Sequence, residues 1–146
     1  MLRRATAEDA DAIAAIFTAA RDEQRFIPAL HTPEEHQWFF REVVLPEQEV
    51  WIAEEDGAAV GFAALNQDLL GHIYVHPTYQ GRGIGRVLFE KVKERRPSGF
   101  TLWTHQPNEG ARRFYEREGL AAVELTDGAG NEEKVPDVRY EWTPES

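Results

Sequence analysis

The feature that most constrains this chain is a glycine-rich turn between a short apolar strand and an amphipathic helix. The strand pattern ends at Pro77, which cannot donate to a β-ladder, and Gly81, Gly83 and Gly85 follow at alternate positions. Glycine has no Cβ, so successive backbone N–H groups can turn toward one point, where the positive end of the helix dipole adds to them. The turn therefore predicts a socket for an anion, most simply a phosphate group.

The spacing of this turn excludes two common phosphate-binding motifs. A Walker loop needs a Gly-Lys-Ser/Thr ending that the stretch lacks. A dinucleotide-binding turn needs a glycine where Arg86 stands. The residues instead match Gln-x-x-Gly-x-Gly, filled by Gln80, Gly83 and Gly85 after a Val-x-Pro strand end. For the glycines taken alone, a strand-to-helix turn without a ligand stays open as the alternative.

Composition indicates an ordinary globular domain and narrows its partners. The 146 residues, 42% of them hydrophobic, suffice for one core, so we expect a single domain over 1–146. The formal net charge of −10 disfavours nucleic acid, which basic surfaces bind. There is no cysteine, so cysteine nucleophiles and disulfides are excluded. No run approaches the roughly 18 apolar residues of a membrane span, and we expect a cytoplasmic protein without membrane attachment.

Alternating periodicities predict an α/β fold in which strands outnumber helices. Strands are expected over residues 2–5, 49–55, 58–65, 69–75, 100–104, 120–125 and 138–142. Helices are expected to begin after caps at Thr6 and Thr32 and to cover residues 84–92 and 109–118. Pro46 is expected to end the second helix. The order β-α-α-β-β-β-α-β-α-β-β implies a mixed, mostly antiparallel central sheet with helices on both faces.

A second segment strengthens the interpretation of the glycine turn. Asn108 precedes a helical pattern that carries Tyr115 and stops at Gly119. Together with the turn from Gln80 to Gly85, this segment resembles the GNAT superfamily of acetyl-CoA-dependent N-acetyltransferases, whose pyrophosphate-binding motif has the form Gln-x-x-Gly-x-Gly. The predicted order of strands and helices is also the GNAT order. The resemblance therefore covers nearly the whole chain, although it is specific only in these two segments.

The resemblance implies that acetyl-CoA is the cofactor and that its pantetheine arm lies where two neighbouring strands splay apart. Asn108 would then hydrogen-bond the arm, and Tyr115 would stand near the thioester sulfur as a general acid. The implied cofactor-binding residues are Ile73, Tyr74, Val75, Gln80, Gly81, Arg82, Gly83, Ile84, Gly85, Arg86 and Asn108. A purely structural role for Tyr115 stays open, because it shares one helical face with Ala111 and Phe114.

The chemistry of such a transfer sets which other groups are needed. An amine with a pKa near ~10 must lose a proton before it attacks a thioester, and the departing thiolate benefits from one. A backbone N–H near Val75 would stabilise the oxyanion. The candidate base is His72, which should lie on the same face of its strand as Tyr74. Asp68 and a water molecule are the alternative bases. We expect no metal, because His72 and His76 straddle a strand end and a proline.

The acceptor amine should lie between the first two helices and a late polar loop, as the resemblance implies. Phe26, His31 and Trp38 are the predicted substrate-binding residues, and they would face residues 127–137. The leading interpretation is acetyl transfer to a primary amine of a small molecule, an amino acid or a peptide. A non-catalytic acyl-CoA-binding or sensory domain is the alternative. A protein-interaction module built on Trp38 and Trp51 is a third possibility, but it would leave the glycine turn unexplained. Homodimerisation stays open; members of the family often form dimers.

Overall fold

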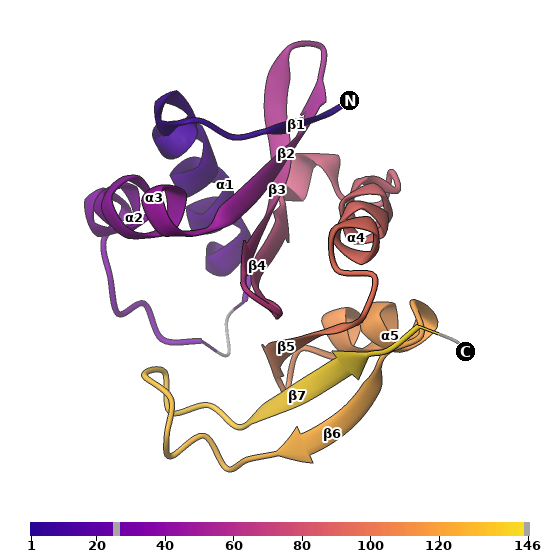
Figure 1. Ribbon diagram of the computed structural model, residues 1–146. Coiled ribbons are helices and arrows are strands. Elements are labelled where there is room, and N and C mark those ends of the chain that lie inside the picture. Colours follow the sequence, from indigo (N-terminus) through magenta and orange to yellow (C-terminus); the bar gives the residue numbers. More distant parts are fainter. Residues whose placement is uncertain (25–26, 145–146) are drawn as a thin grey trace.

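A single mixed sheet organises the molecule, seen in a computed structural model that describes residues 1–24 and 27–144 (Figure 1). Its strand order is β1-β2-β3-β4-β5-β7-β6. Only β4 and β5 pair in parallel; the other neighbours recorded in the described chain are antiparallel. The strands are β1 Leu2–Arg4, β2 Glu49–Glu55, β3 Ala58–Asn66, β4 Leu69–Val75, β5 Phe100–His105, β6 Ala121–Leu125 and β7 Asp137–Trp142. The predicted α/β fold is confirmed.

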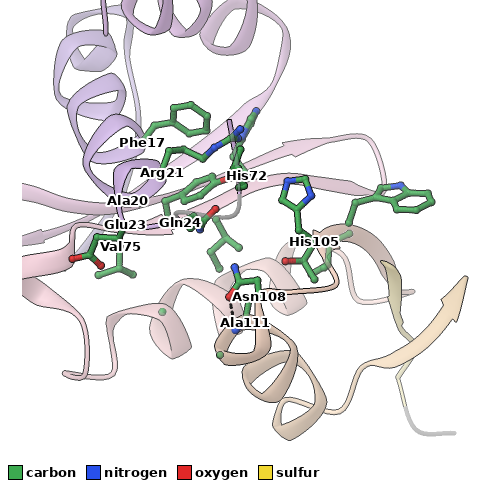
Figure 2. A pocket seen from close by; sticks show the side chains of 18 of the residues that line it. Phe17, Ala20, Arg21, Glu23, Gln24, His72, Val75, His105, Asn108 and Ala111 are labelled. Atoms are coloured by element: carbon green, nitrogen blue, oxygen red, sulfur yellow. Dashed lines mark hydrogen bonds between the residues drawn. The ribbon is translucent and has the colours of Figure 1, made fainter. Parts of the chain in front are cut away.

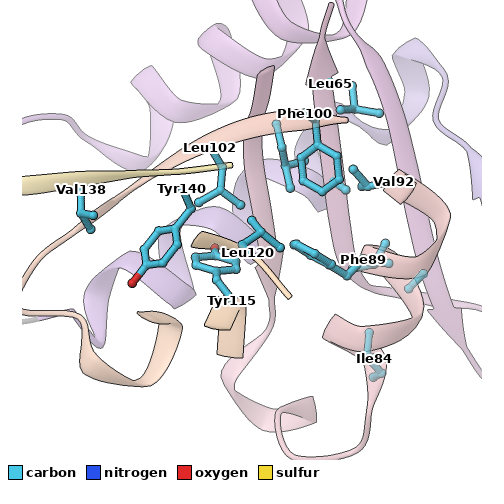
Figure 3. Packing of buried hydrophobic residues seen from close by; sticks show 14 of the residues in the cluster. Leu65, Ile84, Phe89, Val92, Phe100, Leu102, Tyr115, Leu120, Val138 and Tyr140 are labelled. Atoms are coloured by element: carbon cyan, nitrogen blue, oxygen red, sulfur yellow. The ribbon is translucent and has the colours of Figure 1, made fainter. Parts of the chain in front are cut away.

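Helices cover both faces of this sheet. On one face lie α1 Ala10–Asp22, α2 Pro33–Phe39, a π-helical turn Phe40–Val44 and α3 Leu45–Glu47; on the other lie α4 Ile84–Arg95 and α5 Glu109–Arg117. Ile13, Phe17 and Phe40 pack on the first face, because their spacing puts them on one side of their helices. Leu88, Phe89 and Tyr115 pack on the second face. Figure 3 shows Phe89 and Tyr115 in this cluster. In the part of the chain that is described, no helix is long and apolar enough to cross a membrane.

Pro46 does not end the second helix, so that prediction is wrong. The helical backbone continues through α3 and ends at Gln48, which is extended (φ −120°, ψ 158°). In a regular α-helix the proline ring would clash with the carbonyl group of Glu42, four residues earlier. The preceding π-helical turn Phe40–Val44 is wider than an α-turn and relieves this clash. Buried Phe40 and Val44 fix the wide turn against the sheet.

The two strands at the centre of the sheet diverge. Leu69 and Thr101 form the one pair recorded between β4 and β5, whereas the β3–β4 ladder runs from Asn66/Leu69 to Gly61/Val75. Peptide groups alternate in direction along a strand, and the His76 N–H donates to the Val60 carbonyl of β3 at 2.8 Å. The Val75 N–H therefore points to the other side, toward the opening between β4 and β5. Figure 1 shows the two strands separating there.

Candidate active site

A cleft of about 1730 Å³ lies along the opening between β4 and β5. One half is lined by the glycine turn, the start of α4 and α5; the other half is lined by α1, α2, β4 and the loop between β6 and β7. The predicted site residues that line it are His31, Trp38, His72, Ile73, Tyr74, Val75, Gln80, Gly81, Gly83, Ile84, Gly85, Arg86, Asn108 and Tyr115. Phe26 falls outside the described residues.

The glycine turn has the conformation of an anion socket. Gly81 and Gly83 have φ values of 80° and 82°, and a Cβ atom built on either would meet nothing within 4 Å. Gly83 is the N-cap of α4, whose first bond runs from the Val87 N–H to the Gly83 carbonyl at 3.1 Å. Within residues 1–24 and 27–144, no N–H from Gly81 to Arg86 donates to a protein group. These amides are thus available to an anionic ligand.

Three polar side chains of the turn differ in where they lie. The Gln80 amide donates to the Val75 carbonyl at 3.1 Å, so it fixes the turn against the end of β4. Arg82 leaves the cleft: it pairs with Glu55 at 3.6 Å and lies over the Tyr79 ring. Arg86 stays at the cleft, with a side chain that is 74% exposed. A role for Arg82 in cofactor binding would therefore have to come from its backbone.

Asn108 caps α5 and still keeps donors for a ligand. Its side-chain oxygen accepts the Ala111 N–H at 3.2 Å, drawn as a dashed line in Figure 2. Its side-chain NH₂ group makes no hydrogen bond to any described residue. The cap needs only the oxygen, so the two amide donors are free to bind a carbonyl group in the cleft.

Tyr115 is both a core residue and a cleft residue. Its ring packs against Phe89 and Tyr140, with centroids 5.9 and 5.7 Å away, and the residue is 8% exposed (Figure 3). Its hydroxyl has no hydrogen-bond partner among the described residues, although the residue lines the cleft. Burial raises the pKa of Tyr115, and the neighbouring phenols of Tyr74 and Tyr140 raise it further. The hydroxyl therefore keeps its proton at neutral pH.

His72 lies at the bottom of the acceptor half in an aromatic environment. The rings of Phe17, Phe39 and Phe40 stand within 6.0 Å of its own, and its Nδ1 atom is buried without a hydrogen-bond partner among the described residues. Burial lowers the pKa of His72 to about 4, and the charge of Arg21 lowers it as well. At neutral pH the ring is uncharged and a poor proton acceptor, which argues against the predicted base.

The second predicted base, Asp68, lies outside the cleft. Its side chain is 87% exposed beside Arg96, in the turn before β4. This turn is at the end of β4 where the strand still pairs with β5, away from the opening. Asp68 is therefore too far along the strand to serve an amine bound beside Tyr74.

A charged network, which the sequence analysis did not predict, crosses the acceptor half. The Glu133 carboxylate lies 3.9 Å from the Arg21 guanidinium and 3.3 Å from His105 Nε2. Figure 2 shows Arg21 beside His72, and His105 on the neighbouring strand. Next to them, His31 contacts both Glu35 of α2 and Glu132 of the β6–β7 loop. The loop thus contacts α1 through Glu133 and the segment before α2 through Glu132.

Comparison with known proteins assigns the family. Residues 46–119, half of the chain, match the model of the acetyltransferase (GNAT) domain. The chain belongs to the GNAT acetyltransferase family. The matched range includes the GNAT glycine turn, Asn108 and Tyr115.

Individual relatives agree with this assignment. The GNAT chain is 33% identical to the peptidyl-lysine N-acetyltransferase YiaC of Escherichia coli (strain K12) over 85 residues, which are 58% of each protein. It thus matches little more than half of that relative's length. Its fold is similar to a GCN5-related N-acetyltransferase from Rhodopseudomonas palustris (TM-score 0.81, 25% identity, 99% of this chain and 95% of that one). The PaiA N-acetyltransferase of Thermoplasma acidophilum, solved in complex with coenzyme A, has a TM-score of 0.75 at 20% identity, covering 99% and 98%.

Sequence reasoning missed Arg21, His105 and Glu133 of this GNAT chain for different reasons. His105 had a weak signal: alternation along β5 buries Leu102 and so turns His105 toward the opposite face, which α1 and α2 cover. Arg21 looked like an ordinary basic residue in the last turn of a helix. Glu133 stands in a polar run that fits a solvated loop equally well. Nothing local in the sequence indicates that the three meet.

Proposed function

We propose that this chain is an N-acetyltransferase that moves the acetyl group of acetyl-CoA to a primary amine of a small molecule, an amino acid or a peptide. The observation that carries the proposal is that Gly81, Gly83, Ile84, Gly85 and Arg86, whose N–H groups donate to no described residue, line the same cleft as Tyr115. Membership of the GNAT family supports it, and so does the presence of coenzyme A in the similar PaiA fold.

The residues of the cleft fit the acyl donor. The amides from Gly81 to Arg86 would hold its pyrophosphate, with the N-terminus of α4 behind them. The Val75 N–H and the Asn108 NH₂ group would bind the amide carbonyls of the pantetheine arm between β4 and β5. When bound, acetyl-CoA supplies an acetyl group activated as a thioester.

The chain would assist the transfer in three ways. Tyr115 keeps its phenolic proton at neutral pH and would donate it to the departing sulfur. A backbone N–H on the open side of β4, near Val75, would stabilise the oxyanion. The cleft would hold the amine against the thioester and so replace a bimolecular encounter by a unimolecular step.

The acceptor half suits an amine that carries an apolar part. Trp38 and Trp103 line it with side chains that are 55% and 42% exposed, which offers apolar surface at its rim. Carboxylates of the β6–β7 loop, among them Glu132 and Glu133, give it a negative potential that attracts an ammonium group. Because the relative YiaC is a peptidyl-lysine N-acetyltransferase, lysine-containing peptides belong in the acceptor panel with free amino acids and polyamines.

Two measurements test this function. Isothermal titration calorimetry with coenzyme A should show one site, and acetyl-CoA with the amine panel should release free thiol, detected with a chromogenic disulfide. Absence of coenzyme A binding at millimolar ligand would contradict the whole proposal. Binding without thiol release for every amine would instead favour the non-catalytic acyl-CoA-binding or sensory domain.

A further inference from the structure

Hydrogen bonds within the β6–β7 loop fix the position of Glu133 in the charged network. The segment that carries Glu133 is folded on itself: the Asn131 NH₂ group donates to the Val135 carbonyl at 2.8 Å and to Asp137 at 3.1 Å. Gln106 ties the two ends of the segment together through the carbonyls of Thr126 and Asp137, at 2.8 and 3.0 Å. These bonds hold a loop that would otherwise be a solvated charge run, and they turn Glu133 inward, with a side chain only 18% exposed.

His105 and His72 both line the acceptor half, but in the part of the chain that the structure describes only His105 has a carboxylate beside it. Its Nε2 atom is 3.3 Å from the Glu133 carboxylate, whereas Nδ1 faces the interior. Burial, the largest effect, keeps the pKa of His105 below its ordinary value; Glu133 acts in the opposite direction, Arg21 lowers the pKa further, and Asp137 and a hydrogen bond with the Val135 backbone raise it. A proton on Nε2 would thus meet a counter-charge, while a proton on His72 would meet aromatic rings and Arg21.

Tyr115, the predicted general acid, lines the same cleft as His105 and Glu133. Tyr74 of β4 lines the same cleft as Tyr115, Arg21 and Glu133. An amine placed against Glu133 is therefore in the same cleft as the predicted acid, and on the β4 face that carries Tyr74.

From this arrangement we propose that the acceptor enters as an ammonium ion against Glu133, that His105 Nε2 takes its proton, and that Glu133 is the positioning residue for His105. This inference rests on the proposed acetyl transfer and names the base that it needs.

Every proton in the proposed transfer can be accounted for. R–NH₃⁺ gives one proton to His105 Nε2, and the resulting imidazolium is stabilised by the Glu133 carboxylate. The neutral nitrogen forms a C–N bond to the thioester carbon, and the C–S bond breaks. Tyr115 gives its phenolic proton to the sulfur and regains one from the nitrogen of the new amide. The proton on His105 leaves to solvent, so one proton is released per acetyl group transferred.

The test uses the amine that gives the fastest thiol release with the wild-type enzyme. His105→Gln should lower kcat by at least roughly 100-fold, the usual contribution of a general base, with the dissociation constant for coenzyme A unchanged. Glu133→Gln should lower kcat less. It should also move the acidic limb of the kcat/KM profile to lower pH, because the imidazolium loses its counter-charge. Turnover of folded His105→Gln within twofold of wild type would overturn the proposal.

A second readout does not depend on turnover. Histidine ring resonances followed by NMR against pH should show that the His105 midpoint falls in Glu133→Gln. The matched control is Glu124→Gln, which breaks a pair with Arg139 at 3.3 Å on the same β6–β7 hairpin but outside the cleft; it should leave the midpoint and the kinetics as in wild type. An unchanged midpoint in Glu133→Gln would show that the pair does not act as proposed.

Failure of this inference and failure of the proposed function give different results. If wild-type enzyme binds coenzyme A but acetylates no amine, the transferase assignment fails before the base is tested. If the wild type is active and His105→Gln is equally active, only the base is wrong. Unfolding temperatures of the variants, measured alongside, separate loss of the base from loss of the fold.

Discussion

At the scale of single residues, Tyr115 combines two roles that the sequence analysis treated as alternatives. Its ring belongs to the core with Phe89 and Tyr140, while the residue lines the cleft and its hydroxyl bonds to no described residue. A residue can satisfy both, because the ring supplies the packing and the hydroxyl supplies the chemistry. The two contributions can be separated by removing the oxygen alone.

Tyr115→Phe should lower kcat by at least roughly tenfold and leave stability nearly unchanged. The ring still fills its place, and the lost hydroxyl bonds to no described residue, so no partner is left unsatisfied. The measurements are kcat with the best amine, coenzyme A affinity by calorimetry and urea unfolding. Unchanged turnover would reduce Tyr115 to a core residue.

Tyr140→Phe is the matched control for that variant. The Tyr140 hydroxyl donates to Glu116 at 2.6 Å and accepts from Arg112 at 3.1 Å, and the residue does not line the cleft. Its removal should cost about 1–2 kcal/mol of unfolding free energy because two charged partners lose a bond, and it should leave kcat as in wild type. The two tyrosines therefore give opposite outcomes from the same chemical change.

Sequence reasoning predicted the cofactor half of the site better than the acceptor half. The glycines, Asn108 and Tyr115 lie within two short segments, so local spacing is enough to group them. The acceptor half joins Arg21, His105 and Glu133, which are far apart in the chain and meet only through the fold. His72 was placed on the right face of β4, but its aromatic surroundings come from other segments, and they decide its pKa.

At the scale of elements, the left-handed glycines of the turn before α4 can be tested by substitution. Gly83→Ala forces an L-residue to φ near 82° and adds a methyl group to the space where the ligand would lie. We expect a loss of about 1 kcal/mol in unfolding free energy and a marked loss of coenzyme A affinity. Both are measured on one preparation, by urea unfolding and calorimetry.

Gly57→Ala is the matched control, because it introduces the same backbone strain at a glycine outside the cleft. Gly57 lies in the β2–β3 turn with φ at 80°, and a Cβ atom there also meets nothing within 4 Å. Its stability loss should match that of Gly83→Ala, while coenzyme A affinity stays unchanged. If both variants bound coenzyme A equally well, the glycine turn would not be the anion socket.

A charge cluster joins α4 to β2, and it makes stability depend on pH. Burial alone would raise the pKa of Glu49, but hydrogen bonds from Arg95 and Trp51 hold it at about 2, below the ordinary value of 4.5. Because folding lowers this pKa, the stabilisation is complete above pH 4.5 and is lost as the pH falls toward 2. The same contacts occupy the Trp51 ring, which also lies under Arg4 and Lys91, so it is not a free interaction surface.

Glu49→Gln should therefore destabilise the protein at pH 7 by about 1 kcal/mol, since Arg95 is partly exposed and solvent screens the pair. The difference from wild type should shrink at pH 3. Urea unfolding at both pH values measures it, and Glu94→Gln on the exposed side of α4 is the control, with a small effect at each pH. A difference for Glu49→Gln that is equal at pH 7 and pH 3 would contradict the linkage.

Element boundaries were largely predictable because each has a local cause. The Thr32 cap, with its reciprocal bond to Glu35, starts α2 where the sequence places it. Pro46 shows the limit: a proline ends a regular helix, but a π-helical turn beside it depends on how Phe40 and Val44 pack against the sheet. The sequence shows that Pro46 disrupts a regular α-helix, but whether the helix ends there or continues through a π-helical turn depends on tertiary packing.

At the scale of the whole molecule, the sheet consists of two groups of hydrogen-bonded strands, called the two ladders below, which one recorded residue pair joins. β1 to β4 form one ladder and β5, β7 and β6 the other, with Leu69 and Thr101 between them. The residues of the cleft come from both ladders: Val75 and the glycine turn from one side, Asn108 and His105 from the other. The fold class followed from the order of elements, whereas the divergence of β4 and β5 was expected only from the resemblance to the family.

A ligand that lies between the two ladders should stabilise both, and hydrogen exchange can show it. Coenzyme A at 100 times its dissociation constant stabilises the folded state by about 2.7 kcal/mol, so amides that exchange only through global unfolding should slow by roughly 100-fold. We expect this slowing in β3 and in β7 alike, together with new protection of Val75 and of the amides from Gly81 to Arg86. The edge strand β6, whose residues are exposed throughout, should not change. Protection confined to β3 and the glycine turn would mean that the two ladders open independently and that the ligand contacts only the first.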